Sequence, residues 1–485
     1  MKNEECDIKP DGMQGRDLTT GSIPRHLIVF AWPMLMGNLL QTAYSIINAI
    51  WVGKGLGVDA MAAITVSMPV FFILMAMALG LTMASGILVS HACGAKDTPQ
   101  LKLIVHNSII LTVVISAACV FIGHYAASLM LTSIHTDPDV LPMAISYLQL
   151  MVWTIPFMFG MFLMSSLLRG TGDSTTPLIF QGVSLLLTGI LDPVLMFGWL
   201  GFPKMGLNGT AVATIFSQAA ALIALMIYIR RKNHIIAPEL KGYRIDIPTS
   251  VLTLRIGIPS MIQQALISFG MFVITGIVNK FGKDGAAAYG VAMRIDQLAF
   301  MPSMAIGMAA STLTGQNIGA KLYSRVSEVF KWAMILGCGI TVIASVSALL
   351  FPQWLLRLFI NDGNVINIGI HYLRIVGAGY VLFAVMFVAN GVINGAGHTF
   401  VTTLISLIGI WIIRFPLAVY LSNKMNRIEG IWYAVVIGFL AGTILSIIYY
   451  ISGRWKRPVT VNFGNSRSGE EDDTIYPPVL DEIID

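Results

Sequence analysis

An aspartate lies in the middle of an apolar stretch of the chain, where a charged side chain is unusual. Asp192 follows a run rich in leucine, and Pro193 comes directly after it. Because proline has no N–H, the carbonyl oxygen of Gly189 would lose its partner in a helix. Thr188 lies one turn earlier, so several oxygen ligands would lie close together. We expect this cluster to hold a cation, either Na⁺ or a proton on Asp192, although a kink aspartate that only caps backbone groups is the alternative.

A second aspartate, Asp296, lies in another apolar stretch, and two arginines could pair with it. Arg294 is only two residues away, and residues with that spacing do not face each other on a helix. Arg414 is the other basic residue deep in an apolar stretch, so it is the candidate for a pair between helices. A structural ion pair and a role in coupling are both open for Asp296.

Other residues could shape a substrate cavity. Pro33 would free the carbonyl of Val29 and allow a bend, which could be static or could respond to protonation. Methionines lie among aromatic residues in 153–164. Such faces suit loose recognition of apolar cations, although ordinary packing explains most of them. The candidate cavity residues are Gln41, Trp153, Met161, Gln264, Arg294 and Arg414.

These residues lie in a chain suited to a lipid bilayer. Of its 485 residues, 56% are hydrophobic and 11% are charged, whereas soluble domains are about 25% charged. Apolar runs long enough to cross a bilayer recur along the whole chain. They lie at about 27–52, 60–90, 103–124, 140–168, 177–199, 208–229, 252–279, 286–314, 328–351, 366–393, 401–421 and 429–452. The fold class predicted is an all-α polytopic membrane protein with twelve transmembrane helices.

Lysine and arginine fall mainly in alternate loops, about 20 on one side against about 7 on the other. This bias predicts a multi-pass protein of the cell membrane with both termini in the cytoplasm. The net charge of +5 therefore reflects topology, and we expect no nucleic-acid partner. The first residues lack the apolar core of a signal peptide. The four cysteines form no CxxC pair, and no HExxH, GxSxG or Walker loop occurs, so we expect neither an enzyme nor a cofactor.

The chain repeats its glycine and proline motifs after roughly 225 residues, as internal structural repeats do. Gly94-Ala95-Lys96 returns as Gly319-Ala320-Lys321, and Pro33 returns as Pro259. With six spans in each half, the halves should be two six-helix lobes related by a pseudo-two-fold axis along the membrane normal. The expected parts are a cytoplasmic N-terminal segment (1–25), a first lobe (26–230), a cytoplasmic linker (231–250), a second lobe (251–455) and a disordered cytoplasmic tail (456–485).

The order of these motifs resembles the multidrug and toxic compound extrusion (MATE) family over about residues 25–455. The matching pieces are 169–173 with Pro177, 191–193, 206–214, Tyr289 with Arg294, 300–302 and 315–320. The resemblance implies two six-helix lobes around a central cavity. It also implies export of organic, often cationic, compounds in exchange for H⁺ or Na⁺.

The resemblance also implies roles for single residues. Asp192 matches an aspartate of the fifth helix, Thr188 stands where many members have asparagine, and Tyr44 matches a tyrosine one turn before the first-helix aspartate. Pro33 matches a bending proline, and Thr214 a threonine of the sixth helix. At the first-helix aspartate itself this chain has Asn48, which can coordinate a cation but cannot take up a proton. Coupling would then run through Asp192 alone or move toward Asp296, since the seventh and tenth helices lack the family's other carboxylates.

The function expected is a secondary-active multidrug antiporter that acts as a monomer in the bilayer on small organic substrates, with H⁺ or Na⁺ as its coupling ion. A lipid-linked oligosaccharide flippase would need a more basic cavity, and an enzyme would need a clustered polar site. An uncoupled facilitator or sensor is a further alternative, because Asn48 has replaced a carboxylate.

Overall fold

In the computed structural model, residues 15–133, 138–238 and 245–457 are described, and every regular element in them is a helix. The first half contains α1 (Ile23–Gly55), α2 (Val58–Gly94), α3 (Thr98–Ser133), α4 (Leu141–Met151), α5 (Ile155–Gly170), α6 (Thr175–Phe197) and α7 (Leu207–Arg231). The second half contains α8 (Ile247–Asn279), α9 (Gly282–Gly319), α10 (Tyr323–Leu350), α11 (Pro352–Arg357), α12 (Gly363–Ala378), α13 (Tyr380–Gly395), α14 (Thr399–Ser406), α15 (Phe415–Met425) and α16 (Glu429–Ile451). The tail beyond 457 and the first 14 residues lie outside the described residues.

The predicted fold class is confirmed. Within the described ranges, 11 helices are long and apolar enough to cross a membrane, or up to 12 if the bent pair α12 and α13 is one span. That pair corrects one expectation: 366–393 is not one straight helix, because the chain bends by 45° between the two helices. Most spans are also longer than expected, as for helices that tilt or extend past the bilayer. For example, α8 begins at Ile247, where the carboxylate of Asp246 accepts a hydrogen bond from the N–H of Thr249 (2.9 Å) and so caps the helix.

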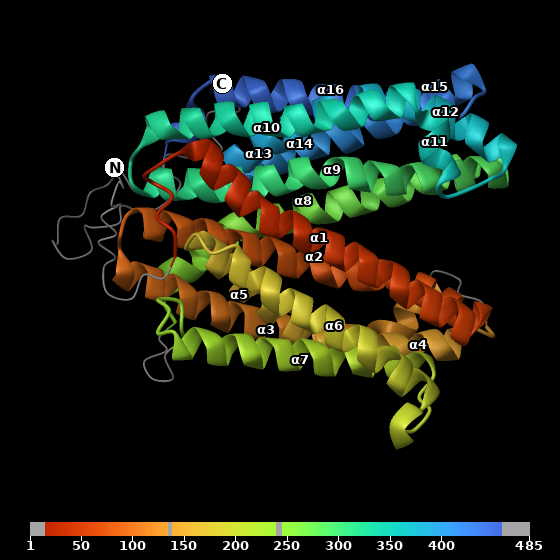
Figure 1. Cartoon of the computed structure of the whole chain (residues 1–485), viewed down its shortest axis with the longest axis horizontal. Coiled ribbons are helices and arrows are strands. Elements are labelled where there is room, and N and C mark those ends of the chain that lie inside the picture. The colour runs from red at the N-terminus through yellow and green to blue at the C-terminus, as the bar shows by residue number, and fades with distance from the viewer. Residues whose placement is uncertain (1–14, 134–137, 239–244, 458–485) are drawn as a thin grey trace, which may run out of the picture.

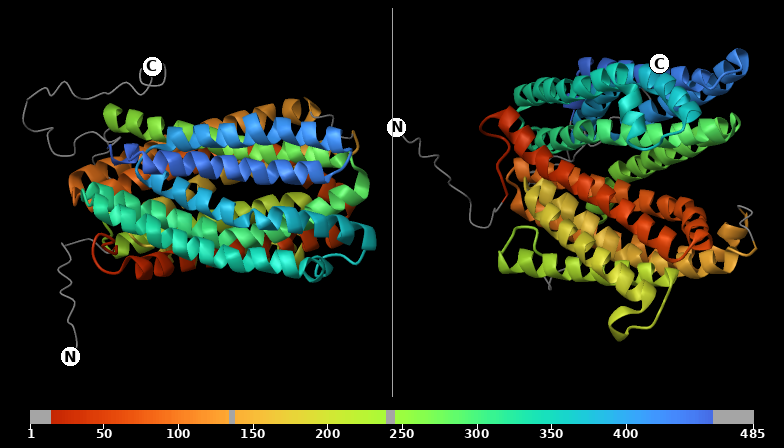
Figure 2. Two further views of the ribbon diagram at one scale, coloured as in Figure 1. Left: turned by 90° about the horizontal axis from the view of Figure 1, so that it is seen from above. Right: turned by 45° about the vertical axis from the view of Figure 1, so that its right-hand side comes forward.

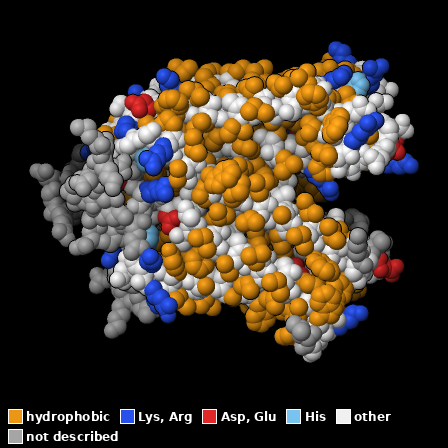
Figure 3. Space-filling view, viewed as in Figure 1, with side chains coloured by type: hydrophobic (Ala, Val, Ile, Leu, Met, Phe, Trp, Pro, Cys, Tyr) orange, Lys and Arg blue, Asp and Glu red, His pale blue; other side chains and the backbone are white. Residues whose placement is uncertain are grey.

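The helices form two lobes, one from each half of the chain (Figure 1). Each lobe has its own hydrophobic core, which includes Phe159 in the first and Trp432 in the second. Large apolar side chains such as Phe121 and Ile343 are exposed on the outside of the helices, and Figure 3 shows apolar side chains covering much of one face. An apolar exterior of this extent fits contact with lipid rather than water.

Two helices cross from one lobe to the other. Helix α1 runs diagonally in Figure 1. At its start, Leu27 and Phe30 share a hydrophobic cluster with residues of α9, α10 and α13. After Pro33 it lies against α6, where Gly37 is next to Gln181. Helix α8 belongs to the second lobe, and its first half packs on α2 of the first lobe. Each crossing helix contains one of the repeated prolines.

The lobes meet at the end of the bundle where the described chain begins and ends. There, a ring nitrogen of His91 lies 2.7 Å from the carbonyl oxygen of Gly395. The side-chain amide of Gln316 donates to the carbonyl of Gly170 (2.9 Å) and accepts from the N–H of Leu18 (3.0 Å). Figure 2 shows the lobes diverging from this end, and the space-filling surface in Figure 3 is hollowed between them at the other. We name these the closed end and the open end.

The repeated Gly-Ala-Lys motif explains how the closed end packs. A Cβ on Gly94 would lie 1.9 Å from the carbonyl oxygen of Gln316, and one on Gly319 would lie 2.0 Å from that of His91. Glycine is therefore required at both positions for the helices to approach. Each motif ends in a lysine with positive φ, 56° at Lys96 and 60° at Lys321, which stops the helix.

Candidate functional site

The first candidate site lies in the first lobe and joins α1 to α6. The hydroxyl of Tyr44 donates to Oδ2 of Asp192 (3.1 Å), and the amide of Asn48 donates to the Tyr44 oxygen (3.4 Å). Tyr44 and Asn48 are one helical turn apart, so they share a face of α1. The structure thus brings together three residues that the sequence analysis selected, and we call them the first-lobe site.

Two oxygens of this site have no partner. Asp192 is fully buried, and its Oδ1 accepts no hydrogen bond within the described part of the chain. The same is true of the buried Oδ1 of Asn48. A buried acceptor without a donor costs roughly 1–3 kcal/mol, and more when it is charged. A proton on Asp192, or a cation held by both oxygens, would remove that cost.

The donor set fits a hard cation or a proton. The described residues contain no group of three or more His, Cys, Asp or Glu side chains that could hold a metal ion. Transition metals that prefer nitrogen or sulfur therefore have no cluster there. Carboxylate, amide and hydroxyl oxygens are the ligands that hard cations prefer, and one carboxylate suffices for a proton.

The two threonines predicted for this site differ in position. The hydroxyl of Thr188 donates to the carbonyl of Ser184 (2.8 Å), one turn back on α6. Thr214 also bonds within its own helix, to the carbonyl of Thr210 (2.8 Å), but it lies beside Tyr44. Pro193 is buried directly after Asp192, inside α6. The sequence analysis missed Tyr147, which lies within range of the Asp192 charge; nothing in its sequence context marks it.

The second lobe contains a different site around Asp296. The hydroxyl of Tyr372 donates to one oxygen of this carboxylate and the hydroxyl of Tyr380 to the other. The ring of Tyr372 packs edge-on against Trp432, with ring centres 4.6 Å apart. Both oxygens of Asp296 are therefore occupied, unlike those of Asp192. The two tyrosines come from the bent pair α12 and α13, which places them on opposite sides of the bend.

The expected candidates for pairing with Asp296 do not pair with it. Arg294 is exposed. Arg414 lies within range of the Asp296 charge, but the structure contains no hydrogen bond or ion pair within 4.0 Å between them. The guanidinium lies instead over the ring of Phe439, 5.5 Å from its centre. Each oxygen of Asp296 accepts a hydrogen bond from a tyrosine hydroxyl instead.

The six predicted cavity residues do not form one site. Met161 is buried in the hydrophobic core near the closed end. Trp153 is half-exposed and packs against the ring of His124. Gln41, Gln264 and Arg294 lie on α1, α8 and α9. No hydrogen bond, ion pair or ring contact joins any two of the six in the part of the chain that is described.

Comparison with known proteins agrees with this architecture. The MatE family model matches twice, at residues 33–194 and 259–420, once in each lobe. The chain is 31% identical over 440 residues to the probable multidrug resistance protein YoeA of Bacillus subtilis, covering 90% of this chain and 95% of that protein. It is 26% identical over 442 residues to the probable multidrug resistance protein NorM of Thermotoga maritima, covering 90% and 94%.

Solved structures show the same fold. An outward-facing multidrug resistance MATE family transporter superposes with a TM-score of 0.84 at 21% identity, covering 92% of this chain and 98% of that one. A mutant of the Vibrio cholerae MATE transporter VcmN gives a TM-score of 0.82 at 21% identity, covering 90% and 98%. The two matches to the family model cover more than half of the sequence. The chain therefore belongs to the MatE family and is a multi-pass membrane transporter rather than an enzyme.

Proposed function

We propose that this protein is a secondary-active antiporter that exports organic compounds, cations among them, in exchange for H⁺ or Na⁺ bound at Asp192. Relatives named as multidrug resistance proteins support the export of varied compounds. The first-lobe site is built from one chain, so a single copy is sufficient to hold the ion.

The observation that carries the proposal is the unpartnered pair of oxygens on Asp192 and Asn48. Inside a membrane bundle, a carboxylate without a counter-charge is costly and usually marks an ion pathway. Tyr44 offers a single hydrogen bond, which is too little to stabilise the anion alone. Binding an ion there would change the contact between α1 and α6, and α1 is a helix that crosses to the other lobe.

Alternating access follows from the two ends of the bundle. The lysine and arginine bias favours a cytoplasmic closed end, which makes this state open to the outside. Opening toward the cytoplasm requires breaking the contacts of His91 with Gly395 and of Gln316 with Gly170. Exchange results only if ion and substrate favour opposite states, because a ligand shifts an equilibrium only by its difference in affinity.

The test is dye accumulation in inverted membrane vesicles under separate H⁺ and Na⁺ gradients, with the methyl ester of a rhodamine as the cationic dye. Wild type should accumulate dye under one of the two gradients. Asp192→Asn should abolish this accumulation, because no group is left to exchange a proton or to bind a cation by charge. Asp296→Asn is the matched control, because it neutralises a buried carboxylate of the other lobe, and gradient-driven accumulation should persist.

Gradient-driven accumulation that survives in Asp192→Asn would contradict the proposal. Dye that equilibrates equally fast in wild type with and without a gradient would instead support the uncoupled facilitator that Asn48 leaves open. An oligosaccharide flippase is less well supported, because the other arginines near the second-lobe spans, Arg294 and Arg374, are exposed.

A further inference from the structure

We propose that residues 15–22 form a strap that holds the closed end shut, and that this strap must leave the first lobe before the protein can open there. The inference rests on the alternating access of the proposed function and adds the device that controls one of its steps. Figure 1 shows the segment, in red, running from the first lobe to the second just before α1 begins.

The strap is fixed to the second lobe by polar and apolar contacts. The N–H of Leu18 donates to Oε1 of Gln316 (3.0 Å), and its carbonyl accepts from the side-chain amide of Asn317 (3.3 Å). The side chain of Leu18 is buried in the hydrophobic cluster that contains residues of α9, α10 and α13. Arg325 of α10 donates to the carbonyl of Gly21 (3.2 Å). A buried leucine together with these hydrogen bonds makes a firm attachment.

The other end of the strap lies against the turn between α5 and α6 of the first lobe. A Cβ on Gly15 would lie 1.8 Å from the carbonyl oxygen of Thr171. A Cβ on Gly172 would lie 2.3 Å from the carbonyl oxygen of Arg16, and Gly172 also has a positive φ of 92°. The two backbones can touch because both positions are glycine, so this second attachment depends on shape.

One side chain joins the strap to both lobes. Gln316 of the second lobe accepts from Leu18, and its amide donates to the carbonyl of Gly170 in the first lobe (2.9 Å). Separation of the lobes removes this second bond together with the backbone contact at Thr171 and Gly172, whereas Leu18 can stay in place. The strap therefore moves with the second lobe, and it touches the α5–α6 turn only while the closed end is shut. A contact that is made in one state alone stabilises that state.

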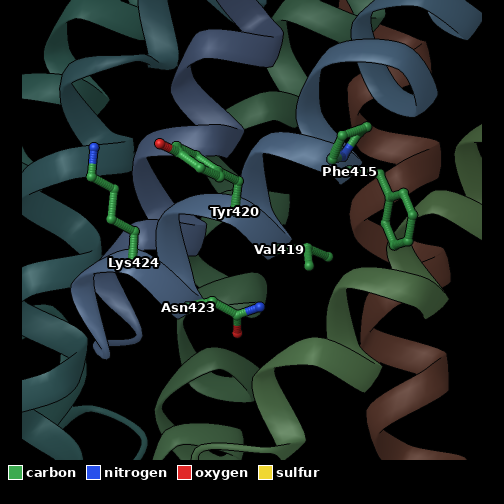
Figure 4. Close-up of a pocket in the computed structure, with 6 residues that line it drawn as sticks. Phe415, Val419, Tyr420, Asn423 and Lys424 are labelled. Carbon is green, nitrogen blue, oxygen red and sulfur yellow. The ribbon is translucent and has the colours of Figure 1, made fainter.

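The experiment measures how often the closed end opens, in purified full-length protein in phosphatidylcholine nanodiscs without substrate or gradient. The reporter is Ser90→Cys, because Ser90 is buried between the lobes, where a Cβ on Gly315 would lie 1.9 Å from its hydroxyl oxygen. Each reporter is the sole cysteine of its chain, and its labelling by a membrane-impermeant maleimide is followed by mass spectrometry. Asn423→Cys gives the reference rate, because Asn423 is exposed and lines an open hollow of about 740 Å³ along α15 at the open end (Figure 4).

Gly15→Ala is the main variant, because its added methyl group clashes with Thr171 only while the closed end is shut. It should raise the labelling rate of Ser90→Cys, relative to the reference, by roughly tenfold, a moderate overpacking effect. Leu18→Ala weakens the attachment to the second lobe and should raise the rate as well. Thr20→Ala is the matched control, because Thr20 is an exposed residue of the same strap, and it should change the rate by less than about twofold.

An unchanged labelling rate of Ser90→Cys in the Gly15→Ala variant would overturn the inference. A second contrary result would be faster labelling at the native Cys93 with an unchanged rate at Ser90→Cys. Cys93 lies within range of the charge of Asp17 in the strap. Its labelling alone would therefore mean that the strap detaches while the lobes stay together, and that it does not hold them.

Two controls separate this result from unfolding and from ion coupling. Faster labelling of the native Cys119, which is buried in the core of the first lobe, shows that a variant has unfolded. Gly15→Ala keeps the test valid if Leu18→Ala is not folded, because Gly15 precedes every helix of the described chain. Gradient-driven dye accumulation that persists in Asp192→Asn, with the expected labelling rates, would contradict only the antiport proposal. Unchanged labelling rates, with accumulation lost in Asp192→Asn, would overturn only the strap.

Discussion

Asp192 and Asp296 are both buried carboxylates in an apolar bundle, yet they differ in the hydrogen bonds that their oxygens accept. Asp192 has one hydrogen bond, from Tyr44, and a free oxygen. Asp296 has a tyrosine hydroxyl on each oxygen and an arginine within range of its charge. A fully bonded carboxylate stabilises one structure, whereas a partly bonded one has a binding capacity left. The two carboxylates are alike in burial, and what separates them is the number of oxygens that accept no hydrogen bond among the described residues.

The largest effect should come from removing the donors of the second lobe. Replacing Tyr372 and Tyr380 together by phenylalanine leaves a fully buried carboxylate without hydrogen bonds. We expect the double variant to lose about 3–5 kcal/mol of stability, as when a buried charge loses its partner. Thermal unfolding of the purified protein in detergent measures the change. Tyr433→Phe, on the exposed face of α16, is the control and should have little effect.

Thermal unfolding of Tyr44→Phe extends the comparison to the first lobe. Because only one oxygen of Asp192 accepts from a tyrosine, this variant should lose less stability than the double variant. If the double variant of the second lobe were as stable as wild type, the two carboxylates would not differ in the way the hydrogen bonds indicate. Asp296 would then become a second candidate for coupling.

How much of this could be predicted from the sequence depends on the range of the interaction. The spans and the two lobes were predictable, because hydropathy and repeated glycines and prolines are local signals. Asp192 was also found from local context, whereas Asn48 was singled out only by the resemblance to the MATE family. The environment of Asp296 was not, because its donors come from α12 and α13, about 80 residues away in sequence. The bend at Gly379 that places them has no clear hydropathy signal.

The partner of Arg414 was also not predictable from the sequence. The sequence identified it as a basic residue deep in a span and suggested Asp296 as its partner. In the structure, the carboxylate of Asp296 accepts hydrogen bonds from two tyrosine hydroxyls, and the guanidinium of Arg414 lies over the ring of Phe439. Charge complementarity in a sequence proposes pairs, but only the positions of competing donors decide them.

A smaller effect should follow from restoring a carboxylate to the first lobe. Asn48→Asp would place a second acid beside the Tyr44 hydroxyl, which already bonds Asp192. Two neighbouring carboxylates repel unless a cation or proton lies between them. We expect the ion concentration for half-maximal dye accumulation to fall by about tenfold, the size of one charge-assisted hydrogen bond. The ion dependence of accumulation in inverted vesicles measures this.

Asn38→Asp, the same chemical change earlier on α1, is the matched control and should leave the ion dependence unchanged. An equal shift in both variants would mean that added charge on α1 acts at long range. It would also mean that Asn48 has no special relation to Asp192.

The smallest effect concerns pH at the closed end, where the last described residues of the chain return to the second lobe. His398 lies between the hydroxyl of Tyr449 (3.0 Å) and the carbonyl of Arg457 (2.9 Å). Burial lowers the pKa of His398 below its usual value, although the bond to Arg457 partly opposes this. A lowered pKa in the folded state means that the neutral ring contributes stability at high pH. That contribution is lost as pH falls below about 6.5, the ordinary histidine value. Thermal unfolding of wild type should therefore decline more between pH 7.5 and pH 5.5, as a rough window around that value, than unfolding of His398→Gln. Parallel curves for the two proteins would show that this end is held by the packing of Trp455 on Tyr450 and not by the histidine.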